Sequence, residues 1–176
     1  MKRLIQWLVL SISIVSASFA IAAGDWVGKS APEFRLQDQN GQWHELKEYK
    51  GHWVALYFYP KDGTPGCTEE AKKFRDRFPD FQKQNIVVLG VSLDDVASHK
   101  AFAEKLGLPF TILADSDHTL AKQFGVLHGF GPISFAKRET FLIDPDGTIV
   151  YHYSSVDSGT HAEQVLQDVA RLSQKP

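Results

Sequence analysis

The sequence predicts an α/β fold in which helices flank a mixed central sheet. Residues 53–59 and 86–92 form continuous apolar runs, which are typical of strands covered on both faces. A helical pattern follows each run, and this alternation indicates a sheet packed between helices. Later, Pro145, Asp146 and Gly147 form a turn between two strand-like runs, which predicts a closing hairpin. We therefore expect one compact unit.

An N-terminal β-hairpin is expected before the first buried strand. Segment 24–46 has short alternating runs on both sides of Asn40-Gly41, and Asn-Gly is a strong hairpin signal. The apolar run that follows is bounded by Gly51 and Pro60. We expect that run to be a central strand of the sheet.

The first helix is expected directly after this strand. Thr64 suits the capping position and Pro65 the first helical position. The helical pattern reaches about Asn85, but Pro79 lies inside it, so the helix should kink or restart there. The other expected elements are a helix capped by Ser98 and ending at Leu106-Gly107, a strand at 110–113, a short helix at 119–124, a glycine-containing loop at 126–137, strands at 139–144 and 148–153, and a helix opened by a Thr160/Glu163 capping box and running to Leu172.

The composition describes an ordinary soluble domain. The chain has 176 residues, of which 43% are hydrophobic, and a formal net charge of -2. Its Lys and Arg residues are scattered, so no basic surface for nucleic acid or for an anionic membrane is predicted.

The first residues resemble a secretory signal peptide. They have a basic start, an apolar middle and small residues before a cleavage point after Ala20, Ala22 or Ala23. The alternative is an uncleaved membrane anchor, because the apolar stretch is close to the roughly 20 residues that span a bilayer. We expect a signal peptide at 1–23 and a periplasmic or secreted domain at 24–176.

Cys67 is the only cysteine in the chain. A single cysteine in an exported protein either bonds to another molecule or is kept for its reactivity, although a passive buried cysteine is a third possibility. Cys67 should lie in the first turn of its helix, beyond the carboxyl end of a central strand, where the free N–H groups and the dipole favour a thiolate. We therefore interpret it as a reactive thiol.

Ionisation alone gives a thiol little extra speed, because its nucleophilicity falls as the thiolate becomes more stable. A fast thiol enzyme must also hold and polarise its electrophile. Three residues could contribute, and each has a plain structural alternative. Thr64 could offer a hydroxyl beside the sulfur, or it could only cap the helix. Pro60 could shield the site, or it could only end the strand. Arg138 could reach the sulfur if its strand is antiparallel to 53–59, or it could be a solvated charge at a strand end.

The segment YPKDGTPGCTEE resembles the Pro-x-x-x-Thr-x-x-Cys signature of peroxiredoxins through Pro60, Thr64 and Cys67. The TPGCT core is similar to the bacterioferritin-comigratory-protein subfamily, also called peroxiredoxin Q. The blocks SAPEFRLQDQNGQ, GVSLDDVASHKAFAEKLGLPFTILAD and KRETFLIDPDGTIV resemble the same subfamily in order and spacing.

This resemblance implies a thioredoxin-like fold and a thiol-dependent peroxidase. Cys67 would attack a hydroperoxide and become a sulfenic acid. Thr64 would hydrogen-bond the peroxide, Arg138 would stabilise the thiolate and the leaving oxygen, and Pro60 would limit water access. Glu70 could orient an arginine or simply complement the helix dipole.

One departure from the subfamily affects the mechanism. Many members carry a resolving cysteine five residues after the first, and here that position is Lys72. The resemblance therefore implies a one-cysteine enzyme that needs an external thiol, such as a thioredoxin-like protein, a glutaredoxin or a small thiol. It also implies a monomer without cofactor or metal.

Other functions remain open. A thiol-disulfide oxidoreductase needs Cys-x-x-Cys, and Glu70 stands at the second position. A copper chaperone needs a second thiolate and a histidine, for which His128 is a loop candidate without a companion motif. A redox sensor that forms a mixed disulfide through Cys67 is the remaining alternative.

Overall fold

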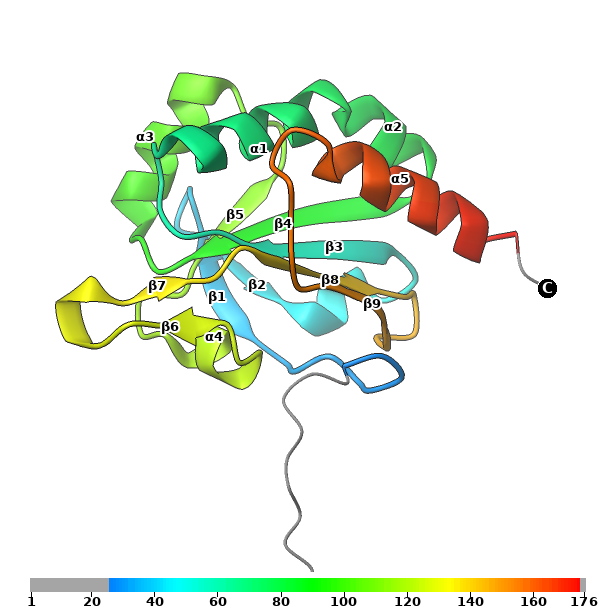
Figure 1. The fold of residues 1–176 in the computed structure, drawn as a ribbon, viewed down its shortest axis with the longest axis horizontal. Helices are drawn as coiled ribbons and strands as arrows, with labels where there is room; N and C mark the ends of the chain where they lie inside the picture. The colour runs from blue at the N-terminus through cyan, green and yellow to red at the C-terminus, as the bar shows by residue number, and fades with distance from the viewer. Residues whose placement is uncertain (1–25, 175–176) are drawn as a thin grey trace, which may run out of the picture.

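The computed structural model describes residues 26–174, apart from the side chain of Pro132, and is built on one seven-stranded sheet (Figure 1). The signal-peptide prediction falls on residues that lie outside this range. The strands follow the order β2-β1-β5-β4-β3-β8-β9. Their bounds are Arg35–Asp38 (β1), Trp43–Glu45 (β2), Trp53–Phe58 (β3), Ile86–Ser92 (β4), Thr111–Ala114 (β5), Glu139–Ile143 (β8) and Ile149–Tyr153 (β9).

The sheet is mixed, as the sequence predicts. Strands β3, β4 and β5 run parallel, and every other pair in the sheet is antiparallel. The N-terminal hairpin of β1 and β2 is present and joins the main sheet through β5. Strand β3 lies between β4 and β8, so the predicted central strand is confirmed.

Both faces of the sheet are covered, which explains the continuous apolar runs. In β3, Ala55 and Tyr57 pack under α1, α2, α3 and α5, whereas Leu56 and Phe58 pack on the other side with α4 and the N-terminal segment. Figure 1 shows the first group of helices above the sheet and α4 below it. The helices span Pro65–Asp76 (α1), Phe78–Lys83 (α2), Val96–Leu106 (α3), Thr119–Gln123 (α4) and His161–Leu172 (α5).

The helical breaks follow local chemistry, with some differences from the expectation. The helix restarts at Pro79 as predicted, because α1 ends at Asp76 and proline occupies the start of α2. The cap of α3 is Asp95 and not Ser98, since the Asp95 carboxylate accepts a 2.8 Å hydrogen bond from the backbone N–H of Ser98. The left-handed Gly107 ends α3 as expected.

The last helix also differs at its start. Thr160 stands at the capping position of α5, but the capping box with Glu163 is not formed. The Thr160 hydroxyl donates instead to the Asp157 carboxylate over 3.1 Å, and Glu163 pairs with Arg77 of the cap between α1 and α2. The α5 start is therefore stabilised by the preceding loop and by a neighbouring helix.

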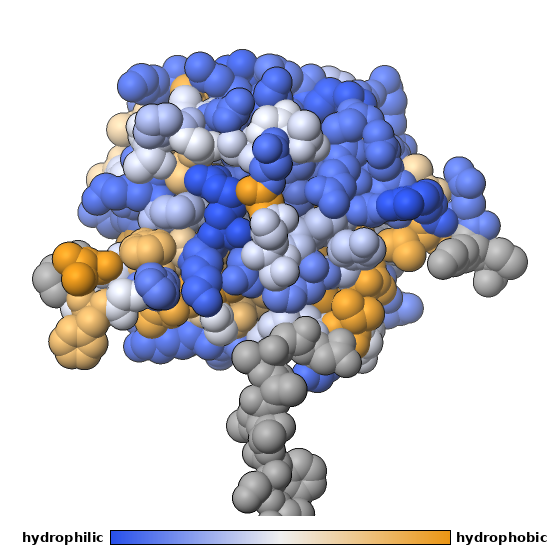
Figure 2. Space-filling view, viewed as in Figure 1, coloured by the Kyte–Doolittle hydropathy of each residue, from blue (hydrophilic) through white to orange (hydrophobic). Residues whose placement is uncertain are grey.

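The region predicted as a loop at 126–137 contains a small ribbon. Two-residue strands, Leu127–His128 (β6) and Phe135–Ala136 (β7), pair antiparallel around a 3-10 turn at Gly131–Ile133. At the tip of this ribbon, Phe130 is 88% exposed and Ile133 is 75% exposed. Figure 2 shows the tip as an apolar projection from the molecule. No helix within residues 26–174 has the length and apolar character to cross a bilayer.

Candidate active site

Cys67 lies where the expected strand-loop-helix unit places it. Strand β3 ends at Phe58, a short loop follows, and α1 begins at Pro65, whose missing N–H costs nothing at this position. Cys67 therefore falls in the first turn of α1, where the backbone N–H groups have no partner within the helix. Its residue exposure is only 2%, so the sulfur is enclosed by the protein.

Arg138, which precedes the neighbouring strand β8, contacts this sulfur. Strand β8 runs antiparallel to β3, and its first residue, Glu139, is the partner of Phe58. Arg138 therefore lies at the same sheet edge as Cys67, and its Nη2 donates a 3.2 Å hydrogen bond to the sulfur. Gly66 permits this approach, since a Cβ there would stand 3.2 Å from that nitrogen.

Glu70 holds the other side of the same guanidinium. It lies one turn after Cys67, its side chain is 1% exposed, and its Oε2 pairs with Nη1 of Arg138. Burial raises the pKa of Glu70 to about 7, although Arg138 acts in the opposite direction. Burial also opposes the charge of Arg138, but Glu70 and Cys67 outweigh it and raise the arginine pKa. One cation is thus shared by a carboxyl group and a sulfur.

Thr64 and Pro60 both lie in the loop that leads to Cys67. Thr64 occupies the capping position, but its hydroxyl makes no cap and instead donates to the carbonyl oxygen of Lys61 over 3.0 Å. That hydroxyl therefore keeps its oxygen lone pairs free to accept. Pro60 is half-buried and lines a cavity of about 500 Å³ together with Ile133 and Phe135 of the ribbon. The structure thus brings Cys67 and Arg138 into contact, whereas the Thr64 hydroxyl is directed to the Lys61 carbonyl and not to the sulfur.

Sequence reasoning missed Tyr57 near the site. Its ring stacks on Phe74 of α1 with centroids 4.7 Å apart, and its buried hydroxyl has no hydrogen-bond partner among the described residues. Burial, reinforced by the nearby Glu70 and Cys67, raises the pKa of Tyr57 well above its usual value. In the sequence this residue is one aromatic position in an apolar strand, and alternation along that strand is the only signal for the face on which it lies.

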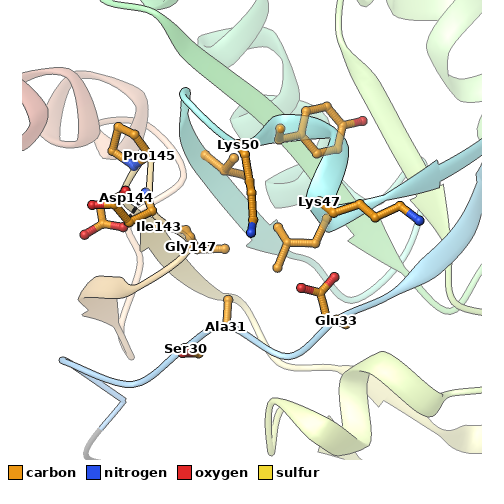
Figure 3. A pocket seen from close by; sticks show the side chains of 13 residues that line it. Ser30, Ala31, Glu33, Lys47, Lys50, Ile143, Asp144, Pro145 and Gly147 are labelled. Atoms are coloured by element: carbon orange, nitrogen blue, oxygen red, sulfur yellow. Dashed lines mark hydrogen bonds between the residues drawn. The ribbon is translucent and has the colours of Figure 1, made fainter.

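A second pocket lies at the opposite end of β3 (Figure 3). Its volume is about 160 Å³, and it is bordered by Lys47, Lys50 and the turn after β8. None of the candidate residues lines it. Between residues 26 and 174 there is no cluster of three His, Cys, Asp or Glu side chains suited to a metal ion, and His128 lies exposed on β6.

Comparisons with known proteins agree on one family. Residues 27–152 match the model of the AhpC/TSA family. The chain is 44% identical over 144 residues to the putative peroxiredoxin bcp of Coxiella burnetii, which covers 80% of this chain and 95% of that protein. It is 40% identical over 153 residues to the peroxiredoxin Bcp of Bacillus subtilis, which covers 85% and 98%.

Solved structures show the same likeness. Peroxidoxin BcpB from Mycobacterium tuberculosis superposes with a TM-score of 0.78 at 34% identity, covering 83% of this chain and 97% of that one. A cysteine-to-serine variant of Xylella fastidiosa PrxQ gives a TM-score of 0.79 at 35% identity, covering 84% and 97%. The predicted thioredoxin-like fold is therefore confirmed.

Proposed function

This chain belongs to the AhpC/TSA family and is a peroxiredoxin of the Bcp/Q type, and from this premise we propose that Cys67 is the residue that reduces the hydroperoxide. The observation that carries the proposal is the 3.2 Å hydrogen bond from Arg138 Nη2 to the Cys67 sulfur. It gives the only thiol in the chain a charged partner in an enclosed site.

In the first half-reaction the Cys67 thiolate attacks the terminal oxygen of a hydroperoxide. The S–O bond forms as the O–O bond breaks, the sulfur loses two electrons to the peroxide, and the leaving oxygen departs as water or an alcohol after it takes up a proton. The product is a sulfenic acid. Negative charge moves from the sulfur to the leaving oxygen during this step. A cationic group that donates hydrogen bonds to both atoms will therefore accelerate the step.

Arg138 has the charge and the number of donors for this task. Its guanidinium already donates to the sulfur, and it carries further N–H donors that can reach a leaving oxygen beside it. Glu70 restrains the guanidinium from its other side. The enclosure of the site strengthens these interactions, because screening by water is weak there. We assign to Arg138 the stabilisation of both the thiolate and the leaving oxygen.

Thr64 and Pro60 have supporting roles in this proposal. The Thr64 hydroxyl donates to the Lys61 carbonyl, so it can accept a hydrogen bond from the O–H of the peroxide and orient it. Pro60 has no N–H and is half-buried in the loop that leads to Cys67, where it limits the entry of water. These roles support binding and orientation and do not change the electron balance.

The second half-reaction needs an external thiol. Cys67 is the only cysteine in the chain, and the position five residues later holds Lys72, which is exposed on α1. An external thiol therefore attacks the sulfenic sulfur, releases water and leaves a mixed disulfide, which a second thiol reduces. A protein dithiol of the thioredoxin or glutaredoxin kind and a small thiol both satisfy this chemistry.

The test is the oxidation of the reduced protein by hydrogen peroxide, followed by intact mass. We expect a gain of one oxygen, or of one thiol adduct when a thiol is present. Cys67→Ser should show neither product. Oxygen uptake that persists in this variant would refute the assignment of Cys67.

A redox sensor is the alternative for the same residue, because Cys67 is reactive in both cases. An enzyme consumes many equivalents of peroxide when a thiol regenerates it, whereas a sensor undergoes one oxidation and then keeps its partner. Measuring peroxide consumed per protein molecule separates the two. The family relationship favours turnover.

We also propose that the protein is exported and acts as a monomer in the periplasm or outside the cell. The support is the basic, apolar and small-residue pattern of its first 23 residues. The intact mass of the protein from the periplasmic fraction tests this, since cleavage after Ala20, Ala22 or Ala23 gives distinct masses. Full-length protein in the membrane fraction would instead indicate an anchor.

A further inference from the structure

Asp62 anchors the loop that carries Pro60 and Thr64 through its side-chain hydrogen bonds. The side chain of Asp62 is only 7% exposed. Its carboxylate accepts three side-chain hydrogen bonds, which come from the Tyr59 hydroxyl at 2.7 Å, the Ser98 hydroxyl at 2.8 Å and His99 Nδ1 at 2.8 Å. Two of these donors belong to α3, so the loop is fastened to a helix that lies more than thirty residues away in the sequence.

Each ring nitrogen of His99 faces an oxygen atom that can accept a hydrogen bond. The side chain of His99 is fully buried, with Nδ1 2.8 Å from the Asp62 carboxylate and Nε2 3.1 Å from the Leu113 carbonyl oxygen. A carbonyl oxygen can only accept. Asp62 Oδ2 lies 2.8 Å from two donors, the Ser98 hydroxyl and His99 Nδ1, and Oδ1 accepts the Tyr59 hydroxyl at 2.7 Å, so both carboxylate oxygens are occupied as acceptors. An ionised carboxylate only accepts, and both ring nitrogens of His99 then donate.

The surroundings of this pair contain one further charge. Asp94, at the start of the loop before α3, accepts the backbone N–H of Asp62 and the hydroxyl of Ser92, each over 2.8 Å. The hydroxyl of Tyr59 also approaches His99 Nδ1 at 3.4 Å, but its donor bond goes to Asp62. Among the contacts described, His99 therefore faces one carboxylate, that of Asp62, and no cation.

A second His–Asp pair in the molecule has a different set of hydrogen-bond partners. In the N-terminal hairpin, His44 Nε2 lies 3.2 Å from Asp38, and its Nδ1 lies 2.7 Å from the Tyr49 hydroxyl. A hydroxyl can donate as well as accept, so one ring proton is sufficient for both contacts of His44. His99 has no such choice, because both of its partners are acceptors.

We propose that protonated His99 is a positioning residue of the peroxidase reaction, which acts through Asp62 to hold the loop of residues 60–64 that leads into the helix of Cys67. This inference rests on the proposed function. With His99 charged, Asp62 is compensated and the loop keeps Pro60 and Thr64 in place for the peroxide. Without that charge, the buried Asp62 carboxylate is left uncompensated and is drawn towards water, which pulls the loop away.

The two half-reactions should respond differently to this positioning. Peroxide is small and needs the assembled site, whereas an external thiol must reach a sulfur in a residue that is 2% exposed. A loosened loop therefore slows the oxidation of Cys67 without slowing its reduction. General damage to the fold would slow both.

The test separates these half-reactions in His99→Gln and in the control His44→Gln. Oxidation by hydrogen peroxide is followed by quenched-flow alkylation of the remaining thiol, and reduction of pre-oxidised protein by free cysteine is followed by intact mass. We expect His99→Gln to oxidise at least about fivefold more slowly while its reduction is no slower than that of the wild type. His44→Gln should change both rates by less than about twofold.

The protonation of the wild type gives an independent readout, which does not require a folded His99 variant. The ring ¹⁵N chemical shifts of His99 at pH 7 should show two protonated nitrogens, and in Asp62→Asn they should show one. An unchanged oxidation rate in His99→Gln, parallel slowing of both half-reactions, or a singly protonated His99 in the wild type would each overturn the inference. If wild-type Cys67 does not react with peroxide at all, the proposed function fails instead.

Discussion

The two ends of strand β3 carry the same kinds of side chain in different surroundings. At its carboxyl end, Arg138 and Glu70 form an ion pair against the sulfur, and Glu70 is 1% exposed. At its amino end, Lys50 and Glu33 border the pocket of Figure 3 and are exposed. Both ends carry charged side chains, yet only the carboxyl end carries the thiol.

We infer that burial, and not the presence of charges, distinguishes the carboxyl end from the amino end of β3. Charges in water at the amino end are screened and interact weakly. Enclosed charges at the carboxyl end act strongly on each other and on any charge that develops on the sulfur or on a leaving oxygen. Variants at matched positions of the two ends can test this interpretation.

The largest effect is expected for Arg138→Ala. This variant removes the donor to Cys67 and leaves Glu70 without its cation, so peroxide oxidation should slow by at least about tenfold and towards the hundredfold losses seen when a charge-stabilising donor is removed. The measurement is the second-order rate of thiol loss with hydrogen peroxide. Lys50→Ala, at the other end, should stay within about twofold of the wild type. An unchanged rate in Arg138→Ala would refute its assigned role.

Glu70→Gln should alter the pH dependence of stability. Burial raises the folded-state pKa of Glu70 from 4.5 to about 7. Between these two pH values the folded protein keeps a proton on Glu70 that the unfolded chain has released. Its contribution to stability is therefore fully present below about pH 4.5 and is lost as the pH rises through about 7. Denaturant unfolding across this range should show the wild type losing up to about 3 kcal/mol relative to Glu70→Gln.

Glu33→Gln is the matched control for this titration. Glu33 is exposed, so its replacement should leave the pH dependence of unfolding parallel to that of the wild type. A Glu70→Gln curve that also runs parallel to the wild type would contradict the effect of burial on Glu70.

Arg138→Lys should have a smaller effect than the alanine variant. Lysine keeps the positive charge but loses the planar fork that contacts the sulfur and the carboxylate at once. We expect an oxidation rate between those of the wild type and Arg138→Ala, within about tenfold of the wild type. Rates equal in the lysine and alanine variants would show that the fork, and not the charge, accounts for the whole effect.

The smallest effect is expected at two tyrosines. The buried hydroxyl of Tyr57 has no hydrogen-bond partner, so Tyr57→Phe should leave the free energy of unfolding unchanged or raise it by less than about 1 kcal/mol. At the other end, the Tyr49 hydroxyl lies 2.7 Å from His44 Nδ1, and Tyr49→Phe should lower stability by about 1 kcal/mol. Urea unfolding measures both. A large loss in Tyr57→Phe would mean that its hydroxyl has a bound partner.

Much of the fold follows from local patterns in the sequence. The apolar run before Pro60 predicts a strand covered on both faces, and the turn at Pro145 predicts the β8–β9 hairpin. These signals lie within a few neighbouring residues, so they do not depend on distant packing. The same holds for the start of α1, where proline at the first helical position locates the helix and with it Cys67.

The contact between Arg138 and Cys67 could be anticipated only through topology. Once β8 is taken as antiparallel to β3, the residue before β8 must lie at the sheet edge where β3 ends. The pairing of Glu70 with Arg138 remained one of two alternatives, because a carboxyl group in the first turns of a helix already has a local reason to be there.

Other features depend on long-range packing or on close competition. Asp62 and His99 are 37 residues apart, and neither has a local signal that names the other. Asp95 and Ser98 are both good capping residues three positions apart, so the pattern alone did not separate them. The β6–β7 ribbon has strands of two residues each, which are too short for a periodicity to be read.

The solitary thiol has a consequence for the lifetime of each molecule. Between the half-reactions, the sulfenic acid at Cys67 is exposed to two competing reagents: a thiol that restores it, and a second peroxide that converts it to a sulfinic acid. The chance of loss in one cycle is the ratio of the second rate to the sum of both. Each molecule therefore completes a finite mean number of cycles, which shortens as peroxide rises and lengthens as thiol rises. The accumulated sulfinic acid would record the oxidant dose that the compartment has received.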